Sequence, residues 1–86
     1  MAERDTCLVV PASYWFEIHG GSPDPNLEQL EYKFHCRIIA EGSLMLVATV
    51  FELADTSGQF RKLMSPRVEK IPKYRVLREE PWDRRP

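Results

Sequence analysis

Two histidines, His19 and His35, are the residues of this 86-residue chain best suited to acid–base chemistry. An imidazole beside a carboxylate can act as a general base, because its ordinary pKa lies near neutral pH. Glu17 and Glu31 lie close to them in the sequence. No nucleophile accompanies either histidine, and nothing in the sequence brings the two together. We therefore expect exposed surface histidines, and a small-ligand site or enzyme subunit built on them is the third of three hypotheses.

The two cysteines, Cys7 and Cys36, form no disulfide framework and do not match the spacing of metal ligands. A zinc site needs three or four convergent ligands, which the histidines and Cys7 do not supply. The glycine pair after His19 lacks the pattern of a phosphate-binding loop and is typical of a turn. We expect both thiols to be reduced and buried, and we expect no metal, no cofactor and no catalytic residue.

The charge distribution is the strongest functional indication in the sequence. Residues 1–60 carry three basic and nine acidic side chains, whereas residues 61–86 carry nine basic and four acidic ones. This asymmetry favours an acidic partner or a polyanion. The acidic part of the chain could also neutralise the basic part, within one molecule or between subunits. The basic residues that we assign to a partner-binding surface are Arg61, Lys62, Arg67, Lys70, Lys73, Arg75 and Arg78.

Three aromatic residues complete this predicted surface. Trp15 lies in the run SYWFEIH, Tyr74 lies within the basic segment, and Trp82 lies in the polar, proline-bounded stretch REEPWDRRP. Tryptophan is a favoured anchor at protein interfaces, and aromatic rings also stack on nucleic-acid bases. The stretch that holds Trp82 is typical either of a frayed end or of a short docking peptide.

The segment 31–54 has the clearest pattern among the elements that must position these residues. Apolar residues recur at every second position from Tyr32 to Ala40, as in a strand with one wet face. Gly42-Ser43 suits a two-residue type II′ turn with a positive φ at the glycine, and the following strand, 44–53, is apolar enough to be central. The pairs that this register predicts are Glu41–Leu44, Ile38–Val47, Cys36–Thr49, Phe34–Phe51, Tyr32–Leu53 and Lys33–Glu52.

A helix is the alternative for part of this segment. Asp24 would cap it, Pro25 would begin it, an apolar stripe from Leu27 to Ile38 would form one face, and Gly42 would end it. A single turn over 25–30, followed by the strand, would satisfy both patterns.

Further strands are predicted on either side. The run 13–19 alternates, which places Tyr14, Phe16 and Ile18 toward the core and Trp15 with His19 on a mixed face. After a turn cluster at 54–59, residues 59–64 return as a strand that Ser65-Pro66 ends, and 73–77 form a last short strand. The loop 20–26, rich in proline and glycine, is a candidate for partner contacts.

These patterns predict a mainly β (or α+β) fold. We expect one antiparallel sheet of four or five strands, rolled into a small barrel or covered by one short helix. The domain would span residues 1–78, and residues 79–86 would be a flexible polar tail. The chain shows no signal-peptide pattern and no apolar stretch long enough to cross a membrane, so we expect a cytoplasmic protein.

The functional expectation is a small non-enzymatic binding protein that docks on a larger protein, as an accessory subunit, an adaptor or an inhibitor. The basic segment would steer this docking and an exposed tryptophan would anchor it. The second hypothesis is a nucleic-acid-binding β domain that uses the same basic residues. It ranks lower because the sequence pI is about 6.1 and no nucleic-acid-binding motif is present. Association of two copies through sheet edges is compatible with either hypothesis.

Overall fold

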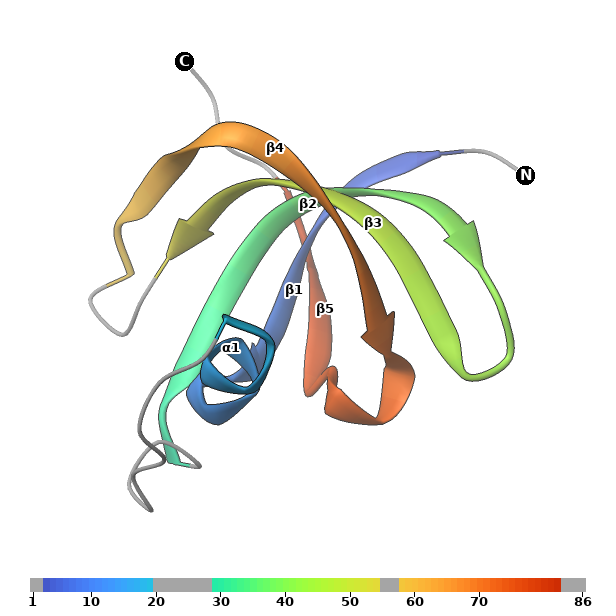
Figure 1. The fold of residues 1–86 in the computed structure, drawn as a ribbon, viewed down its shortest axis with the longest axis horizontal. Coiled ribbons are helices and arrows are strands. Elements are labelled where there is room, and N and C mark those ends of the chain that lie inside the picture. Colours follow the sequence, from blue (N-terminus) through green and yellow to red (C-terminus); the bar gives the residue numbers. More distant parts are fainter. Residues whose placement is uncertain (1–2, 20–28, 55–57, 83–86) are drawn as a thin grey trace.

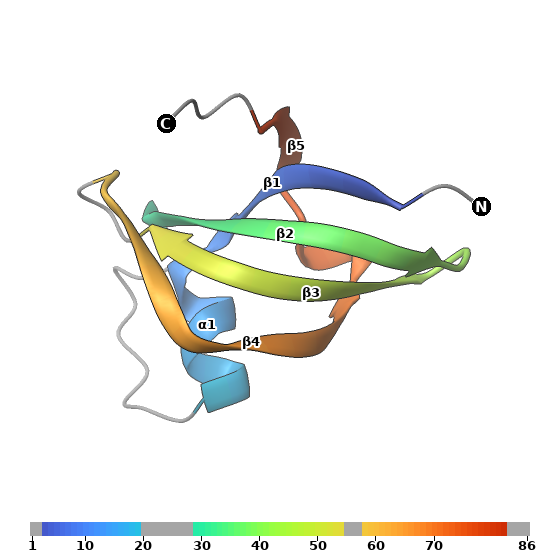
Figure 2. The same cartoon turned by 90° about the horizontal axis from the view of Figure 1, so that it is seen from above.

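A computed structural model, which describes residues 3–19, 29–54 and 58–82, places five strands in one antiparallel sheet of order β4-β3-β2-β1-β5 (Figure 1). A single short helix, α1, follows β1 and lies on the concave side of the curved sheet (Figure 2). The predicted mainly β fold with one antiparallel sheet is confirmed, and the covering is the short helix, since the sheet does not close into a barrel. The bounds are β1 Arg4–Pro11, α1 Ala12–His19, β2 Glu31–Glu41, β3 Met45–Ala54, β4 Phe60–Pro72 and β5 Arg78–Pro81.

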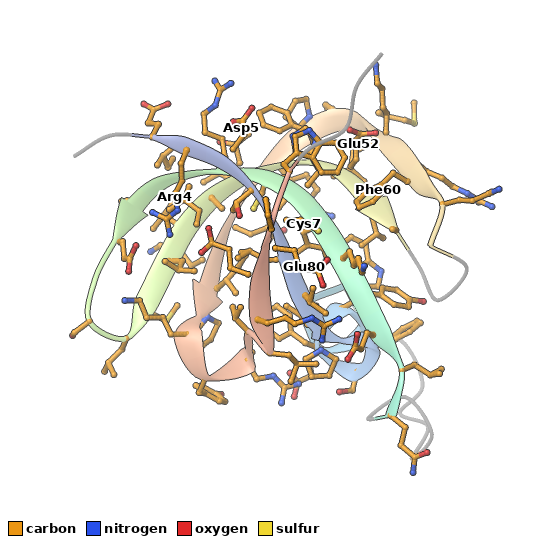
Figure 3. All side chains as sticks on the ribbon, turned by 180° about the vertical axis from the view of Figure 1, so that it is seen from behind. Arg4, Asp5, Cys7, Glu52, Phe60 and Glu80 are labelled. Atoms are coloured by element: carbon orange, nitrogen blue, oxygen red, sulfur yellow. The ribbon has the colours of Figure 1, made fainter. Side chains whose placement is uncertain are left out.

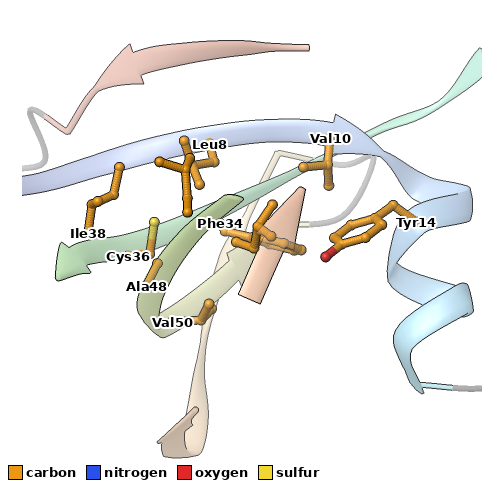
Figure 4. Close-up of a cluster of buried hydrophobic side chains, with 10 residues drawn as sticks. Leu8, Val10, Tyr14, Phe34, Cys36, Ile38, Ala48 and Val50 are labelled. Carbon is orange, nitrogen blue, oxygen red and sulfur yellow. The ribbon is translucent and has the colours of Figure 1, made fainter. Parts of the chain in front are cut away.

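The core lies between the concave face of the sheet and α1. On β2 the predicted alternation is confirmed, since Phe34, Cys36 and Ile38 are buried while their neighbours are partly or fully exposed. The helical alternative for this segment is wrong over residues 31–41, and its proposed start at Asp24 lies outside the described residues. The side chains that complete the core come from the other elements, namely Leu8, Val10, Tyr14, Leu46, Ala48, Val50 and Ile71 (Figure 4).

The strand β1 is central, although its sequence pattern did not single it out. It pairs with β2 on one side and with β5 on the other. Its run of buried residues, from Thr6 to Pro11, is covered on both faces of the sheet. A strand buried on both faces loses the alternation by which a half-exposed strand is recognised.

The predicted register of the β2–β3 hairpin is wrong. Three residues, 42–44, connect the strands, Glu41 lies opposite Leu46, and the Gly42 N–H donates to the Met45 carbonyl at 2.8 Å. Gly42 does not have the positive φ that a type II′ turn requires. At the loop the pairing is offset by two residues from the expected Glu41–Leu44, which keeps the same side chains on each face. A register shift between Ala40 and Ile38 then moves the pairing by one residue, so residues 46, 48 and 50 of β3 face the core in place of 47, 49 and 51. The observed pairs include Ile38–Ala48, Cys36–Val50, Phe34–Leu53 and Lys33–Ala54.

A bulge at Phe51 then changes the facing of β3 again. The register passes from Cys36–Val50 directly to His35–Glu52, so Phe51 has no partner on β2. Phe51 and Glu52 both contact His35 on the convex face, and Leu53 returns to pack against the core. A single extra residue in one strand produces this kind of local reversal.

The run 13–19 is a helix, so its predicted strand is wrong. Tyr14 is buried in the core as predicted, whereas Phe16 is only half-buried and lies against Tyr32 at 6.3 Å between ring centroids. Positions four apart, such as 14 and 18, share a face in a helix and in a strand alike. An eight-residue run therefore does not separate the two periods, and Ile18 lies outside the described side chains.

The C-terminal third also departs from the predicted strands. The strand β4 continues through Ser65-Pro66 to Pro72, because it is an edge strand and a proline there removes no hydrogen bond from the sheet. Residues 73–75 form a 3₁₀ turn, η2 (Lys73–Arg75), where a strand was expected over 73–77. The last strand, β5, runs past the domain boundary that we placed at residue 78 and pairs with β1. The predicted tail therefore begins inside the sheet, and residues 83–86 lie outside the described part.

The different burial of two phenylalanines gives a test of the register. Phe34 is fully buried at the centre of the core, whereas Phe51 is half-buried on the convex face. We expect Phe34→Ala to lower the free energy of unfolding by about 3–5 kcal/mol and Phe51→Ala to lower it clearly less. Urea titrations of both variants measure this difference, and equal losses would contradict the bulge at Phe51.

Two glycines provide a second test. Gly58 has a φ of +83°, which L side chains rarely adopt, whereas a Cβ on Gly42 would meet only the Met45 carbonyl oxygen at an ordinary 3.7 Å. We expect Gly58→Val to cost about 1–2 kcal/mol of unfolding free energy. The matched substitution Gly42→Val should change stability by no more than about 0.5 kcal/mol. Thermal unfolding of the pair decides the point, and a larger loss at Gly42 would restore the two-residue turn.

Candidate functional site

The convex face of the sheet carries a cluster of aromatic side chains around His35. The His35 imidazole stacks on the indole of Trp82, with 3.7 Å between ring centroids and 9° between planes. Phe60 meets the same indole edge-on at 4.9 Å, and Phe51 lies 5.5 Å from the imidazole. Figure 3 shows this face from behind the sheet and labels side chains from four of its strands, among them Cys7, Glu52 and Phe60. We call His35, Glu52, Phe51, Phe60 and Trp82 the convex cluster.

A buried hydrogen bond joins His35 to Glu52 inside this cluster. The distance from His35 Nδ1 to Glu52 Oε2 is 2.9 Å, and the exposed fractions of the two side chains are 13% and 8%. A buried carboxylate needs a donor, so Nδ1 of His35 carries a proton and donates it to Glu52. The other nitrogen, Nε2, is buried and has no hydrogen-bond partner in the described structure. The pair is therefore oriented as in a general base, but Nε2 is closed off from solvent.

Cys7 lies directly opposite His35 in the β1–β2 register, a juxtaposition that sequence spacing does not reveal. Burial raises the pKa of the Cys7 thiol, with a smaller contribution from Glu80. An activated cysteine has a lowered pKa and some exposure, and Cys7 has neither. Cys36 lies in the core on the other face, as the alternation predicted, and burial raises its pKa to about 12. Both cysteines are unbonded and buried, as expected.

Ion pairs surround the convex cluster. Arg37 Nε donates to Asp5 at 2.8 Å, which lowers the pKa of that carboxyl, and the guanidinium lies over the Phe51 ring. Lys33 and Arg78 both contact Glu80, at 3.2 and 2.9 Å. These charged groups are thus paired with one another within the described part of the chain.

Three of the seven predicted basic residues are neutralised within the chain. Lys73 contacts Glu41 at 2.8 Å, Arg75 contacts Glu17 at 2.6 Å, and Arg78 contacts Glu31 at 2.9 Å. These hydrogen bonds lower the pKa values of Glu41 and Glu31. Acidic residues from the first part of the chain therefore neutralise the basic residues that follow β4. This is the neutralisation within one molecule that the sequence analysis gave as an alternative to partner binding.

The other four basic residues lie along β4. Arg61, Lys62 and Lys70 are exposed and form no ion pair with a described residue, whereas Arg67 lies 3.5 Å from Glu69. Two apolar side chains on the same strand are exposed as well, Met64 fully and Val68 to 64%. The strand also bends, because four residues, 63–66, stand opposite the single residue Phe51 of β3 (Figure 1). Positive charge and exposed apolar area thus coincide on one edge of the sheet.

Both tryptophans pack against aromatic side chains of their own chain. Trp15 is half-buried and meets Phe34 edge-on at 5.6 Å, so it lies on the core side and not on the mixed face that we predicted. Trp82 belongs to the convex cluster. Tyr74, in contrast, is 82% exposed on η2, next to the exposed Leu44, whose carbonyl accepts the Lys73 N–H. The side chain of His19 and the loop 20–26 lie outside the described residues.

No family model, no curated protein and no solved structure matches the chain, so no relative's site can be carried over to these residues. Within the described ranges, no three side chains of the metal-binding types gather in a way that could hold a metal ion. In the same ranges, no helix has the length and apolar character to span a membrane.

The buried pair His35–Glu52 can be tested by a double-mutant cycle. Each of His35→Ala and Glu52→Ala removes this hydrogen bond from a buried polar group, and we expect each to cost about 1–3 kcal/mol of unfolding free energy. The double variant should cost less than the sum of the two, by about 0.5–3 kcal/mol. The substitution His35→Ala also removes the stack on Trp82, but it does so both in the wild type and in the Glu52→Ala background. This contribution therefore cancels from the interaction energy of the cycle. Additive urea-unfolding energies would mean that the two side chains do not interact.

Proposed function

We propose that this chain is a small non-enzymatic binding protein that docks on an acidic surface of a larger protein through β4. The observation that supports the proposal is the coincidence, on one edge strand, of three exposed cations without an ion pair in the described structure and of two exposed apolar side chains. It would serve in the cytoplasm as an accessory subunit, an adaptor or an inhibitor.

The distribution of charge over the fold favours β4 as the docking surface over the other residues that we predicted to bind a partner. Lys73, Arg75 and Arg78 already contact carboxylates, and a partner would have to displace them. Exposed ion pairs contribute little to stability because water and salt screen them, so their main effect is to neutralise these cations. Arg61, Lys62 and Lys70 keep their charge available for long-range attraction, which accelerates association with an acidic partner.

The apolar part of the interface is supplied by Met64 and Val68. Long flexible methionine side chains adapt to irregular partner surfaces, and Met64 is fully exposed at the bend of β4. The anchoring role that we first assigned to the tryptophans passes to these two residues, because both indoles pack against side chains of their own chain.

Nucleic acid is the competing partner, and one observation favours it. Tyr74 is 82% exposed just after the strand that carries the exposed cations, and an exposed aromatic ring near basic residues can stack on a base. The same cations would then contact phosphates, and binding would weaken steeply with salt.

An affinity capture from the source cell distinguishes these partners. The bait is the wild type, a triple variant Arg61→Ser, Lys62→Ser, Lys70→Ser, or a charge-preserving control Arg61→Lys, Lys62→Arg, Lys70→Arg. We expect a protein that the wild type and the control retain, that the serine variant loses, and whose retention survives nuclease. With that protein purified, the association rate of the serine variant should fall by about tenfold or more.

Two results would contradict the proposal. Equal capture by the serine variant, shown by circular dichroism to be folded, would exclude β4 as the docking surface. Loss of capture on nuclease treatment, together with tight binding of a random oligonucleotide by the wild type alone, would favour nucleic acid.

A further inference from the structure

The bend of β4 presents the hydroxyl of Ser65 on an extended backbone. Four residues, 63–66, stand opposite Phe51 alone, so Ser65 has no paired residue on β3. Leu63 packs against the core and holds one side of the bend, whereas Ser65 and Pro66 are exposed. Ser65 lies within a strand, and a residue that precedes proline is restricted to extended conformations. The hydroxyl is therefore accessible on a segment that the β3–β4 pairing does not hold.

The other serine and threonine hydroxyls of the described residues lack this combination. Thr6 is buried and donates to Glu79, and the Ser13 hydroxyl is buried in α1. Thr49 is half-buried on β3 and paired with a strand on each side. Ser43 is exposed, but it lies in the tight loop between β2 and β3. Among these hydroxyls, that of Ser65 alone is both exposed and extended.

These properties are the ones that phosphoryl transfer from a kinase requires. The hydroxyl must enter the cleft of the kinase and lie in line with the γ-phosphorus of ATP. An exposed, extended segment that is unpaired at the hydroxyl can enter such a cleft without unfolding of the sheet. Pro66 selects the class of kinase, because proline has no N–H to donate and would leave an acceptor at that position unpaired. The matching enzymes are those that prefer proline after the serine.

A phosphate at this position would change the charge of the proposed docking surface. The strand β4 carries four basic side chains and one acidic side chain, a net charge of +3. A phosphoserine carries a charge of about −1.5 to −2 at pH 7, so the net charge would fall to about +1. Ser65 also lies between Met64 and Val68, the exposed apolar residues of β4. A phosphate buried beside them in an interface would lose its hydration without a cation of the acidic partner to replace it.

We propose that Ser65 is phosphorylated by a proline-directed serine kinase and that the phosphate releases an acidic partner from β4. The release rests on the proposed docking function, whereas the phosphorylation does not. In the transfer, a bond forms between Ser65 Oγ and the γ-phosphorus of ATP. The bond from that phosphorus to the bridging oxygen breaks, ADP leaves, and the hydroxyl proton passes to a base of the kinase.

Incorporation of phosphate into the folded chain tests the site. The full chain carries Ser22→Ala, because Ser22 is the other serine that precedes a proline, and is incubated with ATP and a purified proline-directed serine kinase. We expect phosphate on Ser65, located by fragmentation mass spectrometry, and none on the exposed Ser43. Ser65→Ala should abolish incorporation, and Pro66→Ala, shown by circular dichroism to be folded, should slow it at least tenfold. Incorporation at other residues with Ser65 unmodified would overturn the site.

A capped peptide of residues 59–70 separates presentation by the fold from recognition of the sequence. We expect the folded chain to be modified at a rate within about tenfold of the peptide, because the bend requires no unfolding. Modification of the peptide alone would show that the fold withholds Ser65, which would overturn the proposal. Modification of neither would overturn it as well.

The chain isolated from its source cell, with phosphatases inhibited, shows whether the modification occurs there. We expect phosphate on Ser65 and none on the buried hydroxyls of Thr6 and Ser13. Absence of phosphate from Ser65 in chain isolated from both growing and starved cells would overturn the assignment.

Affinity capture tests the release of the partner. The bait is the Ser22→Ala chain phosphorylated on Ser65, compared with the same preparation after treatment with a phosphatase. We expect the phosphorylated bait to retain at least tenfold less of the partner protein and the phosphatase to restore capture. Equal capture by the two preparations, with capture lost by the triple serine variant of β4, would overturn the release and leave docking through β4 intact. Equal capture by all three would overturn docking and release together, whereas phosphate transfer to Ser65 is measured without any partner.

Discussion

The interruption of register at Phe51 is the constraint on which much of this sheet depends. Toward β2, it leaves Phe51 without a partner, and toward β4 it stands opposite the four residues 63–66. As a result, the side chains of Val50 and Leu53 pack in the core, whereas those of Phe51 and Glu52 lie on the convex face and contact His35. The same irregularity bends β4 and exposes Met64. Bulges increase local twist, and here one position shapes the core, the convex cluster and the edge that we assign to a partner.

The elements that could be predicted are those that a pattern within their own short stretch of sequence identifies. The alternation on β2 fixed Phe34, Cys36 and Ile38 as core residues, because one of its faces is wet and the other dry. The facing of β3 was not predictable, since it depends on two register shifts in the β2–β3 pairing, one between Ile38 and Ala40 and one at Phe51. The continuation of β4 through Pro66 was missed because a proline breaks a central strand but not an edge strand, and the position of a strand in the sheet is a tertiary property.

The candidate site divides in the same way. Composition alone pointed to the basic segment, and four of its seven cations do lie on one strand. Folding decides that Lys73, Arg75 and Arg78 are paired, because their partners Glu41, Glu17 and Glu31 come from other elements and are far away in the sequence. The convex cluster had no sequence signature. Its His35, Glu52 and Trp82 are brought together by three different strand pairings and by the residue that follows β5.

The position of β1 has a consequence for the order in which the molecule is made. Its two neighbours, β2 and β5, lie about 30 and 70 residues further along the chain. During synthesis, β1 and β2 can pair early, yet the second edge of β1 and the ring of His35 stay uncovered until β5 and Trp82 have emerged. Contacts between such distant segments form slowly. The edge of β1 that faces β5 is therefore open until all the other strands have been made, and this interval is where chaperones would matter most for the yield of folded protein.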